Sequence, residues 1–298
     1  MPAAPPVVLT IAGFDPSSGA GITADIKVIA AHECYGIACL SAITVQSTQG
    51  VRRVEPVDPK TIADTLTELA ADFAIAAVHI GMLANEPTVG AVADFLDHAH
   101  LPHVVLDPIL KSSSGADLLD AEGTRLMIRR LFPLAELVTP NLDEAAALTG
   151  VTPDAHAQPA PESSAASLER MRQAAGQLHA LGAANVVVTG GHLDKAIDLL
   201  SFTASSGIEQ EVFKAERQRS TSTHGTGCAF STALACHLAQ GRGIPEAVLL
   251  SKAYVSFAIA NAQPLGHGAG PLHHLYRMNQ QRRPSAGVSE ADDDRSRN

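Results

Sequence analysis

Residues 223–239 read THGTGCAFSTALACHLA, a glycine-flanked turn followed by a run of helix-forming residues. Gly225 and Gly227 permit a tight turn, and a helix that begins there leaves backbone N–H groups unpaired at its positive end. Such an end binds phosphate or a developing phosphoryl charge, and it lowers the pKa of a cysteine placed there. Cys228 occupies this position, so the stretch predicts an anion site with a reactive thiolate. The alternative is a glycine-softened turn before an ordinary core helix.

A second glycine-rich loop lies near the start of the chain, in the sequence AGFDPSSGAGITAD of residues 12–25. It follows the apolar run 7–12, which is typical of a buried strand, and we expect a helix from about residue 22. Asp25 falls in the first turn of that helix, where its carboxylate could point into a cleft at the end of the strand. The alternative is a charge that only complements the helix dipole.

Strand-like and helix-like runs alternate along the chain. The strand-like runs are 7–12, 37–45, 76–82, 103–109, 136–140 and 185–190. The helix-like runs are 22–33, 59–72, 87–99, 122–131, 142–149, 167–181, 226–241 and 245–262. This alternation predicts a mainly parallel sheet covered by helices on both faces. Segments 196–203 and 210–216 are typical of two antiparallel strands, and residues 151–166 of a surface loop.

The composition indicates an acidic globular chain. Of its 298 residues, 46% are hydrophobic, and the formal net charge is −10. The sequence shows no basic face, which argues against a nucleic-acid partner, and no apolar run long enough to span a membrane. The four cysteines lack zinc-site spacing and indicate a reduced, cytoplasmic protein. We expect a single domain over residues 7–278, a flexible start at 1–6 and a disordered tail at 279–298.

Five motifs follow one another in a specific order. They are AGFDPSSGAGITAD at 12–25, TPNLDEA at 139–145, GGH at 190–192, HGTGC at 224–228 and GAGPLHH at 268–274. With these motifs the chain, from about residue 7 to 277, resembles the hydroxymethylpyrimidine/phosphomethylpyrimidine kinases of thiamin biosynthesis, which belong to the ribokinase-like superfamily. The resemblance implies a three-layer α/β/α fold with a mainly parallel central sheet flanked by helices.

The resemblance also implies a reaction. It is the ATP-dependent phosphorylation of 4-amino-5-hydroxymethyl-2-methylpyrimidine, and then of its monophosphate to the pyrophosphate, with Mg²⁺ as the metal. Gly225, Gly227 and Cys228 would form the catalytic group. Phosphoryl transfer needs donors for the moving charge and a base for the incoming hydroxyl, and the thiol could act as that base or as an anion beside the hydroxyl.

Two carboxylates and three further residues match the family's metal and nucleotide region. Asp107 and Glu144 would serve Mg²⁺, which prefers few direct carboxylates and several waters. Asn141, Thr189 and Gly191 would contact the nucleotide, although some members of the family carry lysine where this chain has Thr189. The alternatives are an ordinary capping box for Asn141 and Glu144 and a plain strand-end turn for Asp107.

The resemblance places the pyrimidine against Gly13, Ala20, Asp25, Gln46 and Met82. Asp25 or Gln46 can hydrogen-bond the amino group and ring nitrogen of an aminopyrimidine, since a carboxylate accepts and an amide both accepts and donates. Some family members have glutamate in place of Gln46. For Met82 the alternative is a side chain that fills a gap in the core.

Two other functions stay open. A pyridoxine/pyridoxal kinase is the enzymatic alternative, because that ring also carries a hydroxymethyl group. A regulatory module that binds a pyrimidine without turnover is the other, although the intact Cys228, Glu144 and both glycines argue against it. A P-loop kinase is excluded, because the chain contains no GxxxxGK[ST] motif. The expected partners are a small-molecule pyrimidine and a second copy of the chain in a homodimer.

Overall fold

The computed structural model describes residues 4–150, 164–190, 196–216, 218 and 220–281. Within them, nine strands form one sheet in the order β3-β2-β1-β4-β5-β6-β7-β8-β9. The strands are β1 (Val7–Phe14), β2 (Tyr35–Ser47), β3 (Gly50–Pro56), β4 (Ile75–Ile80), β5 (Val104–Leu106), β6 (Leu137–Val138), β7 (Val186–Gly190), β8 (Ala196–Ala204) and β9 (Gly207–Ala215). Six neighbouring strands run parallel to one another: β2, β1, β4, β5, β6 and β7. Strand β3 is antiparallel to β2, β8 is antiparallel to β7, and β9 is antiparallel to β8.

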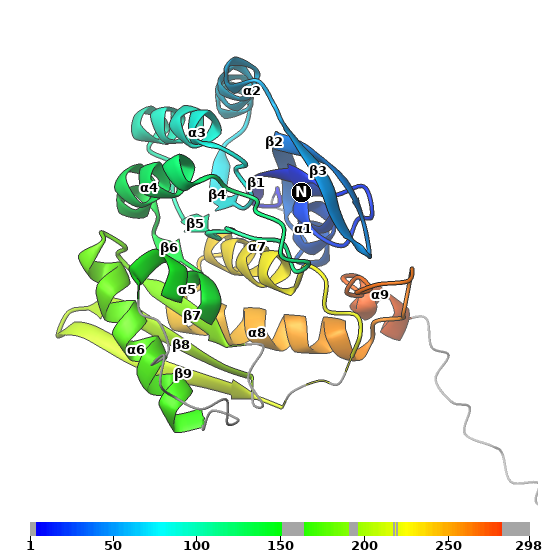
Figure 1. The fold of residues 1–298 in the computed structure, drawn as a ribbon, viewed down its shortest axis with the longest axis vertical. Coiled ribbons are helices and arrows are strands. Elements are labelled where there is room, and N and C mark those ends of the chain that lie inside the picture. Colours follow the sequence, from blue (N-terminus) through cyan, green and yellow to red (C-terminus); the bar gives the residue numbers. More distant parts are fainter. Residues whose placement is uncertain (1–3, 151–163, 191–195, 217, 219, 282–298) are drawn as a thin grey trace, which may run out of the picture.

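Helices cover both faces of this sheet, which gives three layers (Figure 1). They are α1 (Gly21–Ala31), α2 (Pro59–Asp72), α3 (Glu86–Ala99), α4 (Ala121–Arg130), α5 (Leu142–Thr149), α6 (Ser164–Ala180), α7 (Thr226–Ala239), α8 (Ile244–Ala260) and α9 (Tyr276–Gln281), with the short 3₁₀ helix η1 (Phe132–Leu134). Helices α2 to α6 pack on one face, and α1, α7 and α8 on the other. No helix in the described part of the chain is long and apolar enough to cross a membrane.

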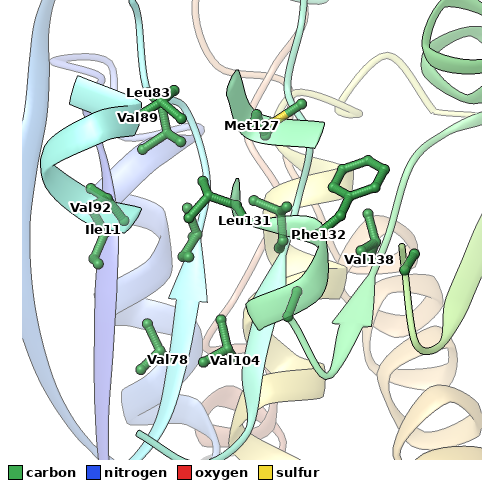
Figure 2. Close-up of a cluster of buried hydrophobic side chains, with 14 of the residues drawn as sticks. Ile11, Val78, Leu83, Val89, Val92, Val104, Met127, Leu131, Phe132 and Val138 are labelled. Carbon is green, nitrogen blue, oxygen red and sulfur yellow. The ribbon is translucent and has the colours of Figure 1, made fainter. Parts of the chain in front are cut away.

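The parallel strands are buried on both faces, as their nearly continuous apolar runs require. On one face, strand residues pack against side chains of α3, α4 and η1 (Figure 2), and the labelled members include Ile11, Val78, Val92, Met127 and Phe132. On the other face, Phe230 and Leu234 of α7 pack against Val8 and Val105. Helix α7, which carries the glycine turn, is therefore held against the centre of the sheet.

The parallel arrangement brings the functional loops together. Because the carboxyl ends of parallel strands meet at one edge of a sheet, the residues that follow them become neighbours. The glycine-rich loop follows β1, Asp107 follows β5, Asn141 follows β6 after two intervening residues, and Thr189 lies at the end of β7. Residues more than 160 positions apart in the sequence, such as Asp25 at the end of the quoted loop motif and Thr189, thus lie toward one edge.

The predicted fold class and the alternation of strands and helices are confirmed, including the two antiparallel strands β8 and β9. Strand β3 was not predicted, because its Arg52, Arg53 and Glu55 lie exposed and interrupt the apolar pattern. Several boundaries were wrong, and β5 and β6 are shorter than the predicted runs 103–109 and 136–140. Helix α6 begins at Ser164, inside the segment expected to be a loop, and α9 extends to Gln281, inside the expected tail.

The remaining boundary predictions are not tested. Residues 1–3, 151–163 and 282–298 lie outside the described residues. The single domain over residues 7–278 stays a prediction.

Candidate active site

The first turn of α7 packs tightly against the loop that follows β1. Gly225 caps the helix with a φ of 81°, in the left-handed region that favours glycine. A Cβ atom on Gly225 would overlap the carbonyl oxygen of Gly19, so only glycine permits this approach. A Cβ atom on Gly227 would lie 3.7 Å from Oδ2 of Asp107. The turn thus joins the two glycine-rich motifs and faces the carboxylate after β5.

Cys228 lies where two helices begin. It is partly exposed in the first turn of α7, and its sulfur accepts a hydrogen bond from the backbone N–H of Gly21, the first residue of α1. Desolvation and the nearby carboxylates of Asp107 and Asp25 nevertheless raise the pKa of Cys228 well above its usual value. The prediction that the helix N-terminus favours the thiolate is therefore wrong, because desolvation and negative charge outweigh the backbone amide.

Asp107 lies directly after β5 and is 4% exposed. Its carboxyl group lies near the side chain of Ser231 on α7, whose hydroxyl donates to the Gly227 carbonyl at 3.0 Å and lies 2.8 Å from Oγ1 of Thr139. Burial raises the pKa of Asp107 well above its usual value, and the negative charges of Glu144 and Asp25 raise it further. A cation beside this group would counter both effects.

Asn141 and Glu144 form the capping box at the start of α5. The Asn141 side chain accepts the Glu144 N–H at 2.9 Å, and the Glu144 carboxylate accepts the Asn141 N–H at 2.9 Å. The carboxylate also accepts the backbone N–H of Leu110. Burial raises the pKa of Glu144 to about 7 against the opposing effect of these bonds. The capping alternative is confirmed, and it places the carboxyl group close enough to Asp107 for the two charges to interact.

The end of β7 adjoins the same cap. The Thr189 N–H donates to the carbonyl oxygen of Pro140 at 2.9 Å, and Thr189 forms a parallel bridge with Asn141. Two of the three predicted nucleotide residues are therefore neighbours. The third, Gly191, lies outside the described residues.

Asp25 does not line a cleft, so the prediction that it contacts the pyrimidine is wrong. It is completely buried, and its carboxylate accepts hydrogen bonds from the hydroxyls of Thr10 at 2.8 Å and Thr232 at 3.0 Å. His79 Nδ1 lies 3.5 Å from the same carboxylate. Helix α1 begins at Gly21, so Asp25 is beyond its first turn and faces inward between the sheet and α7.

Gly13 and Met82 lie against each other. A Cβ atom on Gly13 would be 2.9 Å from the sulfur of Met82. Met82 is 6% exposed and packs in a small apolar cluster with Ala42 and Leu118. Most of the Met82 side chain therefore fills a gap in the core, as the alternative states. Because Gly13 has no side chain, the Met82 sulfur can lie close to β1.

Gln46 belongs to a polar chain that the sequence did not reveal. Its Nε2 lies 3.1 Å from His224 Nε2, which is also 2.9 Å from Oδ2 of Asp15. The same Asp15 oxygen accepts the backbone N–H groups of Gly19 at 3.2 Å and Ala20 at 3.0 Å. Burial alone would raise the pKa of Asp15, but hydrogen bonds, foremost that with His224, outweigh it and lower the pKa. Asp15 and His224 both lie inside the motifs quoted above. The presence of one titratable side chain in each glycine-rich loop was the sequence signal for this contact.

A cavity of about 410 Å³ opens beside Gln46 and His224. Hydroxyl and imidazole groups line much of it, among them Ser112, Ser114 and His267. A larger groove of about 680 Å³ lies between α2 and α3, but it contains none of the predicted site residues. Of the two, the smaller cavity is the one that a predicted site residue, Gln46, lines.

The residues at the strand ends fit a shared metal site. Among the residues that the structure describes, no three His, Cys, Asp or Glu side chains are grouped so as to hold a metal ion by themselves. Asp107 and Glu144 offer two oxygen donor groups, and Mg²⁺ in nucleotide sites uses one or two carboxylates together with phosphate and water oxygens. The donor set thus suits Mg²⁺ held jointly with a nucleotide.

Comparison with known proteins gives the family. The sequence profile of the phosphomethylpyrimidine kinase family matches residues 15–273. A hydroxymethylpyrimidine/phosphomethylpyrimidine kinase of Streptomyces coelicolor is 37% identical over 278 residues, which are 93% of this chain and 97% of that protein. A thiamine biosynthesis bifunctional protein of Geobacter sulfurreducens is 41% identical over 90% of this chain, and the match spans about half of its length, 52%.

The fold has solved counterparts. The ADP complex of the Bacillus subtilis pyridoxal kinase superimposes with a TM-score of 0.79 at 32% identity, covering 93% of this chain and all of that one. The family match, the high identity over most of the chain and the shared fold agree with the motifs and the geometry. The chain belongs to the phosphomethylpyrimidine kinase family.

Proposed function

We propose that the chain transfers the γ-phosphoryl group of ATP to the hydroxymethyl group of 4-amino-5-hydroxymethyl-2-methylpyrimidine, and then to the resulting monophosphate. Family membership makes the chain a kinase of thiamin biosynthesis. The observation that carries the proposal is the meeting of the α7 N-terminus, Cys228 and the paired carboxylates Asp107 and Glu144 at one edge of the sheet. Together they offer amides for the moving phosphoryl charge and oxygens for its cation.

The roles of the glycine turn and the thiol follow from their positions. The free N–H groups of α7 would stabilise the charge on the phosphoryl group in transit. Cys228 lies in that turn and is partly exposed, so its sulfur can meet the substrate hydroxyl. Its raised pKa makes deprotonation of the thiol costly, but it also makes the thiolate a strong base once it forms.

The nucleotide would lie along Asn141 and Thr189, beside the carboxylates. Asp107 and Glu144 would hold Mg²⁺, directly or through water. When bound, the ion neutralises charge on the β- and γ-phosphates. The chain's own residues support this geometry, because the capping box orients Glu144 and Asp107 is buried directly after β5.

The pyrimidine would lie in the cavity beside Gln46. The amide of Gln46 can both accept from and donate to an aminopyrimidine, and its neighbours Thr44 and His224 limit its rotation. Asp25 takes no part in this contact, because its oxygens bind the hydroxyls of Thr10 and Thr232.

Pyridoxal phosphorylation is the second candidate function, because the fold of the Bacillus subtilis pyridoxal kinase covers nearly the whole chain. The deciding experiment measures product formation with ATP and Mg²⁺ on three substrates: the hydroxymethylpyrimidine, its monophosphate and pyridoxal. We expect both pyrimidines to be phosphorylated efficiently. Efficient turnover of pyridoxal alone would reverse the ranking, and pyrimidine binding without any turnover would favour the non-catalytic alternative.

Cys228→Ser tests the role of the thiol. The hydroxyl keeps much of the shape but is a much weaker base, so kcat for the first phosphorylation should fall by about 10²-fold or more, while the pyrimidine still binds. The second phosphorylation attacks with an oxygen that is already ionised and should lose less. Rates of the two steps are measured separately; equal, small losses in both would make the sulfur a spacer.

Gly225→Ala tests the close approach of the two loops. The added methyl group would meet the Gly19 carbonyl, so we expect kcat to fall by about 10²-fold, the scale of losing a positioned donor. Gly241→Ala is the matched control, because Gly241 has the same φ of 81° with open space where its Cβ would lie. It should cost about 1 kcal/mol of stability and leave kcat unchanged. Similar kcat values in both variants would rule out the steric argument.

We further propose that the chain acts in the cytoplasm, where its four unpaired cysteines would stay reduced. We also propose that it forms a homodimer through the exposed face of β2. Leu40, Ile43 and Val45 lie on that face and are 39–49% exposed, an apolar row that a second copy would cover. Ile43→Glu should convert the dimer to a monomer in sedimentation velocity, whereas Leu249→Glu, at an exposed position of α8, should not. A monomeric parent protein at micromolar concentration would refute the interface.

A further inference from the structure

A buried ion pair joins β8 to α8, on the face of the sheet that carries α7. Asp198 Oδ2 lies 2.6 Å from Lys252 Nζ, and the two side chains are only 7% and 9% exposed. Burying two charges costs free energy that their attraction barely recovers, and an apolar pair of similar volume is often as stable. A contribution to folding stability is therefore a weak explanation for the presence of this ion pair.

The second oxygen of Asp198 points to another role. Its Oδ1 accepts the backbone N–H of Gly190, the last residue of β7, at 3.1 Å. Lys252 thus engages one oxygen of the carboxylate and fixes the direction of the other. The lysine acts on the strand end through the carboxylate.

This strand end is the one that adjoins the nucleotide region. One residue before Gly190, the Thr189 N–H binds the Pro140 carbonyl, and Thr189 bridges to Asn141 at the cap of α5. The backbone at the end of β7 is therefore held from two sides, by the Pro140–Asn141 segment and by the Asp198 side chain. A shift of Gly190 would move Thr189 relative to Asn141.

We propose that Asp198, oriented by Lys252, is a positioning residue for the nucleoside triphosphate, which it serves by holding the amide of Gly190. The inference rests on the proposed function, since it takes the nucleotide to lie at Thr189 and Asn141. It concerns the nucleotide alone, because neither member of the pair is among the residues that line the cavity beside Gln46.

Two double variants separate positioning from packing. Asp198→Asn with Lys252→Met removes both charges but keeps an oxygen that can accept the Gly190 N–H. Asp198→Leu with Lys252→Met removes both charges and the acceptor, with side chains of similar volume. The Gly190 hydrogen bond is thus the intended difference between them. Thermal unfolding checks that both are folded, and Asp198→Ala with Lys252→Met replaces the leucine variant if the larger side chain prevents folding.

The readouts are the affinity for a non-hydrolysable ATP analogue by calorimetry and the KM values for ATP and for the pyrimidine. We expect the asparagine variant to stay within about threefold of the parent protein. The leucine variant should bind the analogue about tenfold more weakly, with KM for ATP raised alike and KM for the pyrimidine unchanged.

The outcomes distinguish the two hypotheses. Equal analogue affinities in the two folded double variants would overturn the positioning role, even if both differ from the parent protein. Equal changes in the KM values for ATP and the pyrimidine would also overturn it, since they indicate a general structural effect. A parent protein that binds no ATP analogue would refute the proposed function itself, and the inference with it.

Discussion

The close approach of Gly225 to the carbonyl oxygen of Gly19 is the contact on which the site depends. It lets α7 begin directly beside the loop after β1, so Cys228 reaches the first amide of α1. Any side chain on Gly225 would separate the two loops, and the positive φ there excludes most residues in any case. The proposed anion site would thus be made by two helix N-termini held together, where one alone would give a weaker and less directed field.

That field faces a concentration of negative charge. Asp107, Glu144 and Asp25 each contribute to the raised pKa of Cys228, and Glu144 and Asp25 raise that of Asp107. Carboxylates packed this closely destabilise one another unless a cation or proton is shared between them. These repelling carboxylates lie at the strand ends, where a metal-bound nucleotide would reduce the repulsion between them. Such an arrangement is expected in a kinase family.

The sequence predicted the fold because the apolar runs of the parallel strands are nearly continuous and the motifs punctuate them. It could not predict β3, whose charged residues lie in solvent. Within the candidate site it predicted the glycine turn and the α5 cap as local structures, since both depend on local spacing. It failed at Asp25 and at the state of Cys228, because burial and contacts between distant elements decide the direction of a side chain and the pKa of a thiol.

The burial of Asp25 shows how the sheet and α1 hold α7, which carries the candidate active-site turn, in place. The Asp25 carboxylate accepts hydrogen bonds from the hydroxyls of Thr10 on β1 and Thr232 on α7, and His79 of β4 lies beside it. Three elements therefore contact this one side chain of α1. Buried hydrogen bonds that join three elements in this way tolerate little displacement. Because Thr232 lies one turn beyond Cys228 on α7, the same network that buries Asp25 fixes the rotation of the helix that carries the thiol.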